Sequence, residues 1–237
     1  MSLSDDELVD QVIEKYFGPP EDLDPELAEC LMETEHFIFI KHPLVNGIYH
    51  PVENALFNKQ LARKREALAE ARETQDWDSF IWIHERPWRL EALQEIAPDL
   101  SNQKFWNLVA RVWIDSENIR ENYRAWDRLL RIDRLGRQFM MDDVEQEALA
   151  QLPDVITVYQ GRTGSRDDGW SWTTQRKTAE WFARRFALLE QDEAWVATGT
   201  VDKANVLAYL LGRSEAEILV APESVIITRE KRLDPRD

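Results

Sequence analysis

The chain has 237 residues, of which 43% are hydrophobic and ten are tryptophan, and its formal net charge is −16. This composition supports a packed core and excludes a disordered chain. The negative charge disfavours duplex nucleic acid and anionic membrane surfaces as partners, because both carry phosphates that repel it.

One cysteine, Cys30, and four histidines are present. A single cysteine excludes a disulfide or a cysteine-based zinc site within one chain, and the histidines fit no standard zinc spacing, so we expect no metal. The amino end is acidic and lacks the apolar run of a secretory signal, and no apolar stretch reaches membrane-spanning length. We therefore expect a soluble, cytoplasmic protein.

The first 150 residues have a mostly helical pattern. Ser4 can cap a helix that stops at Gly18, and Asp24-Pro25 is typical of an N-cap followed by the first helical residue. Helix-forming residues predict the longest helix over about 52–74, with turns near 47–51. Ser101 can cap the next helix, and apolar residues at helical spacing predict another over about 116–132.

After about Pro153 the pattern changes to that of strands. One helix is expected among them, with Thr174 as its N-cap. The β-branched and aromatic runs that predict strands cover 155–160, 170–173, 194–201, 206–211, 215–220 and 224–228. This arrangement predicts an α+β fold in which residues 1–150 form a helical region of unknown role and residues 151–237 form a separate domain.

Three short motifs follow one another in the second region. They are Val158-Tyr159-Gln160-Gly161-Arg162, Trp170-Ser171-Trp172-Thr173-Thr174 and Glu215-Ala216-Glu217-Ile218. In order and spacing they resemble the strand motifs of ADP-ribosyltransferases of the Arg-Ser-Glu class, small phage and bacterial proteins in particular. The stretch 179–184 resembles the helix that follows the serine motif in that family. The resemblance covers about the last 85 residues and implies a compact split-sheet domain.

The resemblance implies that the enzyme uses NAD as its substrate and that Glu217 acts at the ribose. Cleavage of the nicotinamide–ribose bond passes through an oxocarbenium-like ribose, and a nearby carboxylate stabilises that positive charge. Ser171 would hold Glu217, with Thr173 assisting on the same strand face. Glu215, which strand alternation places on the face of Glu217, would activate the acceptor.

The remaining residues of the implied site would bind NAD. Gly161 would let the backbone approach the nicotinamide amide beside Tyr159, and Trp181 or Phe182 would stack on the ring. The chain departs from the family pattern at Gln160. In that family, an arginine at this position contacts the phosphate or ribose of NAD.

Two arginines are candidates for the missing charge. Arg162 lies two residues after Gln160, on the same strand face, and Arg166 lies in the loop that follows.

The resulting expectation is a mono-ADP-ribosyltransferase, a glycosyltransferase that modifies a protein side chain. Glu215 suggests arginine as the acceptor. The resemblance fits a phage or bacterial effector that acts in the cytoplasm of a bacterium or a phage-infected cell. Two alternatives remain open: an NAD glycohydrolase that uses the same Glu217, and a non-catalytic binding protein that keeps the fold but has lost NAD binding at Gln160.

Overall fold

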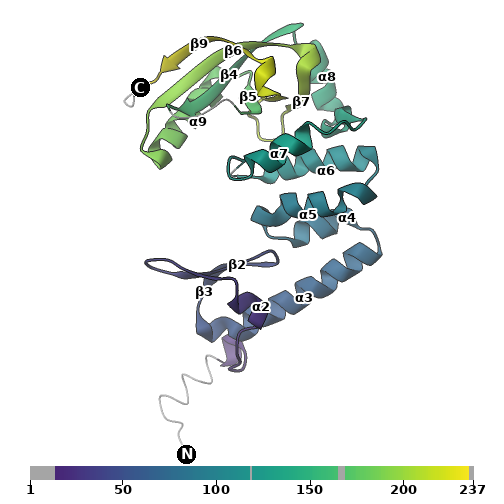
Figure 1. Ribbon diagram of the computed structural model, residues 1–237, viewed down its shortest axis with the longest axis vertical. Coiled ribbons are helices and arrows are strands. Elements are labelled where there is room, and N and C mark those ends of the chain that lie inside the picture. The colour runs from purple at the N-terminus through teal and green to yellow at the C-terminus, as the bar shows by residue number, and fades with distance from the viewer. Residues whose placement is uncertain (1–13, 118, 165–168, 235–237) are drawn as a thin grey trace, which may run out of the picture. The chain divides into compact units, whose positions relative to one another are not determined.

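The computed structural model describes residues 14–117, 119–164 and 169–234 (Figure 1). The α+β class is confirmed: helices predominate in the amino-terminal region and an antiparallel sheet occupies the carboxyl-terminal part. The chain forms two compact units, Met1–Asp99 and Leu100–Asp237. None of the described helices combines the length and the apolarity needed to cross a membrane.

The first unit contains a small antiparallel sheet as well as helices. Its strands, in the order β1-β2-β3, are β1 (Leu31–Glu33), β2 (Ile38–His42) and β3 (Val45–Tyr49). The prediction of a mostly helical region with turns near 47–51 misses this sheet. Ile40 and Val45 are fully buried in it, and the β-branched and aromatic residues of this stretch favour extended backbone.

The helices of the first unit follow the predicted caps and propensities. Asp24 caps α2 (Pro25–Ala28) by accepting a hydrogen bond from the Glu26 amide, and the longest helix is α3 (Asn54–Glu73), as predicted. The predicted helix that stops at Gly18 is described only over residues 14–17, and its Ser4 cap lies outside the described residues. The unit is completed by α4 (Trp77–Ile83) and α5 (Arg89–Ile96).

The second unit begins with helices that precede its sheet. Ser101 caps α6 (Asn102–Asp115) as predicted, by accepting from the Lys104 amide. The helix predicted over 116–132 is shorter, since α7 (Tyr123–Leu130) starts seven residues later than expected. A helix without a specific prediction, α8 (Asp143–Gln151), begins at a capping box formed by Asp142 and Glu145.

Six antiparallel strands form the sheet of the second unit, in the order β7-β8-β5-β4-β6-β9. All six predicted strands are present with shifted ends, and the predicted helix between the second and third is α9 (Arg176–Glu190). Gln175, not Thr174, is the N-cap of α9. The strands are β4 (Val155–Thr163), β5 (Ser171–Thr173), β6 (Ala194–Asp202), β7 (Val206–Leu210), β8 (Glu217–Val220) and β9 (Ile226–Arg232).

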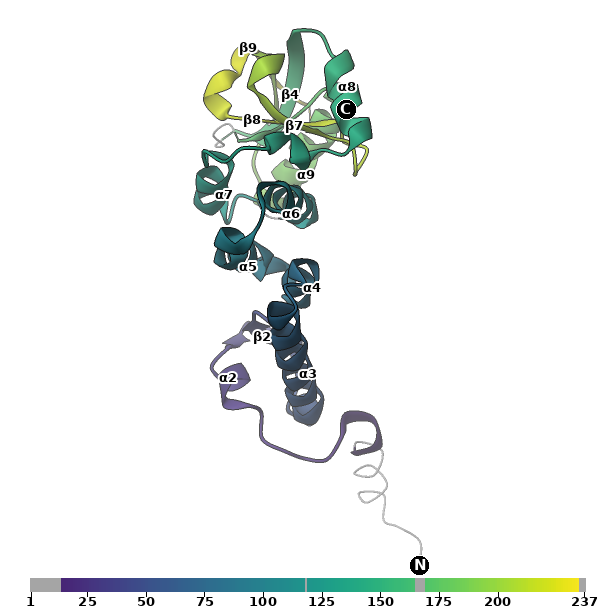
Figure 2. The ribbon, with the colours of Figure 1, turned by 90° about the vertical axis from the view of Figure 1, so that its right-hand side faces the viewer.

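The two faces of this sheet are covered by different helices. Ala179 and Ala183 of α9 pack against Val196 of β6 on one face. On the other face, Leu149 of α8 packs against a core that includes Trp172 of β5. Figure 2 shows α6 and α7 on the same side of the sheet as α9.

The division between the compact units falls at residues 99/100, whereas the change in composition suggested a boundary near residue 150. Helices α6 to α8 belong to the same unit as the sheet. Residues of α8 pack on the sheet core, and Arg131 after α7 binds Glu223 with two hydrogen bonds of 2.5 and 3.0 Å. This ion pair lowers the pKa of Glu223 to about 2.

Candidate functional site

The centre of the candidate site is a hydrogen bond between a serine and a glutamate on adjacent strands. Ser171 Oγ on β5 donates to Glu217 Oε1 on β8 over 2.5 Å. The strands pair antiparallel, with Ser171 opposite Leu219 and Thr173 opposite Glu217, so the bond runs diagonally across the ladder. Ser171 is exposed, whereas only 5% of Glu217 is accessible. The structure thus brings together two of the predicted site residues.

A tryptophan from α6 provides a second donor to the same carboxylate. Trp113 Nε1 donates to Glu217 Oε1 over 3.0 Å, and the Trp113 side chain is fully buried. Its ring packs edge-to-face against Trp126 of α7, with centroids 5.0 Å apart. The paired tryptophans therefore fix the orientation of Glu217 from the helical side.

Arg213 faces the other carboxylate oxygen of Glu217 and also Glu215. Its Nη2 lies 3.7 Å from Glu217 Oε2, and its Nε lies 3.3 Å from Glu215 Oε2. The expectation that Glu215 and Glu217 share a strand face is corrected, because β8 starts only at Glu217. Ser214 and Ala216 adopt positive φ angles of 58° and 47°, so Glu215 lies in a turn and the strand alternation does not apply to it.

Burial raises the pKa of the Glu217 carboxyl, because water is largely excluded from it. The negative charge of Glu215 acts in the same direction. The hydrogen bonds from Ser171 and Trp113 and the charge of Arg213 oppose the rise, since each stabilises the ionised form. The net pKa is above the ordinary value of 4.5.

The Thr173 hydroxyl bonds to backbone groups and not to the Glu217 carboxylate, although Thr173 was expected to assist Ser171. Its Oγ1 donates to the Glu215 carbonyl over 2.6 Å and accepts from the Gln175 amide over 3.0 Å. Thr173 therefore joins the turn before β8 to the start of α9 and positions the backbone of Glu215.

Helix α9 lies directly against Gly161. A Cβ atom at this position would lie 2.1 Å from the Ala179 carbonyl oxygen and 2.6 Å from the Ala183 amide nitrogen. The absence of a side chain allows the helix to pack on β4, so α9 occupies the space that we expected the nicotinamide amide to approach. Tyr159, on the same face, packs against the cluster that includes Ala179 and Ala183.

Gln160 and Arg162 lie on the opposite face of the sheet from Glu217. Tyr159 pairs with Thr173, and Thr173 pairs with Glu217, so these three side chains share one face. Gln160 and Arg162 are each offset by an odd number of residues from Tyr159 and therefore point to the other face.

The contacts of these two residues agree with that placement. Gln160 Nε2 donates to the Ser171 carbonyl over 2.9 Å, and its Oε1 is buried with no hydrogen-bond partner among the described residues. Arg162 forms an ion pair with Glu230 of β9. The structure thus does not place Arg162 beside Glu217 as a replacement for the charge missing at Gln160. Arg166, the other candidate, lies outside the described residues.

The two aromatic residues expected to stack on nicotinamide lie on α9. Trp181 is 53% exposed, and its ring contacts Phe182 edge-to-face at 4.8 Å between centroids. The buried face of the helix is marked by Ala179 and Ala183, and Trp181, two residues from each, points away from it.

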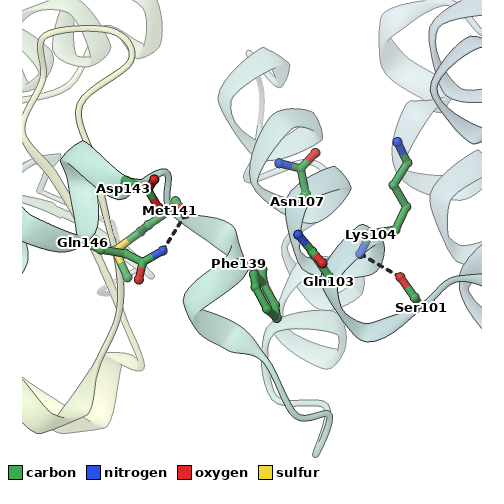
Figure 3. Close-up of a pocket in the computed structure, with 8 residues that line it drawn as sticks. All are labelled: Ser101, Gln103, Lys104, Asn107, Phe139, Met141, Asp143 and Gln146. Atoms are coloured by element: carbon green, nitrogen blue, oxygen red, sulfur yellow. Dashed lines mark hydrogen bonds between the residues drawn. The ribbon is translucent and has the colours of Figure 1, made fainter.

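A surface pocket of about 510 Å³ lies elsewhere in the same unit (Figure 3). It is formed where residues of α6 face Phe139 and the start of α8. No residue of the three motifs lines it. The lining residues are Ser101, Gln103, Lys104, Asn107, Phe139, Met141, Asp143 and Gln146.

Two residues of the site were not predicted from the sequence. Trp113 precedes Glu217 by 104 positions and lies on a helix whose pattern indicates core packing, so nothing local marks it. Arg213 has a local signal, because it precedes Glu215 and Glu217 by two and four residues. An arginine that close to two carboxylates is expected to contact at least one of them.

Comparisons of the chain with protein-family models, with curated proteins and with solved structures find no match.

Proposed function

We propose that the chain is a mono-ADP-ribosyltransferase that moves ADP-ribose from NAD to a protein side chain. The observation that carries this proposal is the 2.5 Å hydrogen bond from Ser171 to Glu217, with Glu215 held nearby by Arg213. A buried carboxylate held in one orientation is suited to stabilise a cationic transition state. Its negative charge is already in position and needs no reorientation during the reaction.

The roles of the residues follow from their positions. Glu217 is the carboxylate that interacts with the ribose hydroxyls as positive charge develops at the anomeric carbon. Ser171 and Trp113 are positioning residues, since both donate to the same Glu217 oxygen. Glu215 is more exposed and serves as the base that takes a proton from the acceptor.

Access to Glu217 requires a movement of the side chains around it. Ser171 is exposed and marks the open side, and Arg213, whose side chain is 37% exposed, lies at Glu217 Oε2. A long, partly exposed arginine changes rotamer rapidly, so displacement of its guanidinium gives a ribose hydroxyl a route to the carboxylate.

Transfer of label from NAD to proteins of a cell lysate tests the function. Wild type should transfer label, Glu217→Gln should lose transfer, and Glu193→Gln should retain it. Glu193 forms an exposed ion pair with Arg232 of the same unit, so this variant removes a carboxylate without touching the site. Equal transfer by wild type and Glu217→Gln, or transfer by neither, contradicts the proposal.

A non-catalytic binding protein is the second candidate, and one observation favours it. Gln160 and Arg162 face away from Glu217, and Arg162 pairs with Glu230, so neither supplies a charge for the NAD phosphates. Calorimetric titration with NAD distinguishes the two. Heat of binding that saturates supports the enzyme, and no binding at millimolar NAD favours the binding protein.

An NAD glycohydrolase, with water as acceptor, would use the same Ser171–Glu217 pair. Glu215→Gln separates hydrolysis from transfer, because water needs less activation by a base next to a highly reactive cation. A transferase should lose label transfer to protein in this variant while it continues to release nicotinamide. A glycohydrolase should show no label transfer even as wild type.

A further inference from the structure

Arg213 lies where the acceptor of the proposed reaction has to lie. Its guanidinium is 3.3 Å from Glu215 Oε2 and 3.7 Å from Glu217 Oε2, so one group contacts both carboxylates of the site. The proposed roles of these carboxylates are to activate the acceptor and to hold the ribose. When a ribose hydroxyl displaces the guanidinium from Glu217 Oε2, the contact of Arg213 Nε with Glu215 keeps the guanidinium beside the ribose.

We propose that Arg213 is itself an acceptor of ADP-ribose, and hence a self-modification site of the chain. This inference rests on the proposed function. The 3.3 Å between Arg213 Nε and Glu215 Oε2 places the guanidinium within reach of the carboxylate that would take its proton. An acceptor on the same chain is present at a high effective concentration without any binding step.

The transfer step balances without an additional reactant. The bond between the nicotinamide nitrogen and the anomeric carbon of the ribose breaks, and its electron pair leaves with neutral nicotinamide. A guanidinium nitrogen of Arg213 forms a bond to that carbon and releases one proton to Glu215, which passes it to water. Nothing is oxidised or reduced, and the products are nicotinamide, a proton and ADP-ribosylated Arg213.

The turn that carries Arg213 favours this placement. Gly212 through Ala216 connect β7 to β8, and both Ser214 and Ala216 have positive φ angles, which cost energy for residues with a Cβ atom. The turn brings Arg213 back over Glu215 and Glu217. The Arg213 side chain is 37% exposed, so a bulky ADP-ribosyl group attached to it extends into solvent.

The experiment is incubation of the purified full chain with NAD, followed by tandem mass spectrometry of its peptides and a separate assay of released nicotinamide. We expect one ADP-ribose on Arg213 and none on Arg176. Arg176 is a matched control, because it is 45% exposed and also pairs with a carboxylate, but that carboxylate is Glu180, over 2.8 Å, and not a residue of the site. Non-enzymatic modification by free ADP-ribose would label both arginines and would overturn the inference.

Two variants and a dilution series sharpen the outcome. Glu215→Gln should lose the label on Arg213 while nicotinamide release continues, and Arg213→Lys should carry no label at position 213. The labelled fraction at a given time should not change with protein concentration, because the transfer is intramolecular. A fraction that rises in proportion to concentration contradicts self-modification within one chain.

The failure of this inference and the failure of the proposed function give different results. Transfer of label to lysate proteins by wild type without ADP-ribose on Arg213 overturns the inference and leaves the function standing. No release of nicotinamide and no label on any protein overturns both.

Discussion

Ser171 and Glu217 lie on neighbouring antiparallel strands, and the serine hydroxyl donates to Glu217 Oε1 over 2.5 Å. This bond stabilises the ionised carboxylate that a buried position disfavours. The serine therefore affects both the orientation and the protonation of the glutamate, and the two effects can be measured separately.

Ser171→Ala should slow nicotinamide release by about tenfold, since one neutral-to-charged hydrogen bond contributes about 1.5–3 kcal/mol and part of that is lost in the transition state. Removal of the donor raises the pKa of Glu217, so the acid limb of the pH–rate profile should move to higher pH. Ser171→Thr keeps a hydroxyl and suits a strand, so the acid limb of its pH–rate profile should return to the wild-type position. An unchanged limb in Ser171→Ala would rule out the assigned role.

The stability of the protein should depend on the ionisation of Glu217. Because the pKa is raised above 4.5 in the folded state, the folded protein holds the proton to higher pH than the unfolded chain. The contribution of this group is fully present below pH 4.5 and is lost as the pH rises through the folded pKa.

Urea unfolding of wild type and Glu217→Gln, repeated at pH values from 4.5 upward, measures this contribution of Glu217 to stability. The free energy of unfolding of wild type, relative to the variant, should fall as the pH increases from 4.5. In the variant, Ser171 and Trp113 still have an oxygen to which they can donate. A difference that rises with pH would show that the carboxylate is stabilised rather than destabilised by its surroundings.

Trp113→Phe should destabilise the second unit by about 2 kcal/mol, because it removes a hydrogen bond to a carboxylate from a fully buried position. The loss of stability should grow as the pH rises through the folded-state pKa of Glu217, because the hydrogen bond to the ionised carboxylate is the stronger one. Trp106→Phe is the control: Trp106 is equally buried but donates to the backbone carbonyls of Arg134 and Leu135. Equal pH dependence in both variants would contradict the role given to Trp113.

Gly161→Ala should destabilise the second unit by about 1–3 kcal/mol, since the added methyl group would overlap the backbone of α9 at Ala179. Gly212→Ala in the same unit is the control. Among the described residues, a Cβ there meets only Ile114 Cδ1 at 3.8 Å, so its effect should stay below about 0.5 kcal/mol. Chemical unfolding measures both, and a neutral Gly161→Ala would mean that α9 does not pack closely on β4.

Local patterns in the sequence predicted the elements of the second unit because its strands and caps carry local signals. The β-branched run at 155–160 and the Ser101 cap needed no tertiary information. The sheet at 31–49 was missed because its strands are three to five residues long and follow no clean alternation of burial. The faces of β4 could not be predicted without its register against β5, which Tyr159 and Thr173 define.

The candidate site was predictable only in part. Ser171 and Glu217 followed from motif order, but the ring nitrogen of Trp113 comes from a helix distant in the sequence. Arg162 was assigned to the site because it lies two residues after Gln160 on the same strand face, but that face is turned away from Glu217, and Arg162 pairs with Glu230 instead. The positive charge beside the carboxylates comes from Arg213, whose turn requires positive φ angles that residues with a Cβ rarely adopt.

The most direct test of the central claim is the release of nicotinamide from NAD by purified wild type, Glu217→Gln and Glu193→Gln. Loss of an electrostatic stabiliser of this kind slows a reaction by about 100-fold or more. Wild type and Glu193→Gln should therefore release nicotinamide at the same rate, and Glu217→Gln should be slower by at least about 100-fold. Equal rates for wild type and Glu217→Gln, or no release by wild type, would contradict the assignment of the Ser171–Glu217 pair as the centre of NAD cleavage.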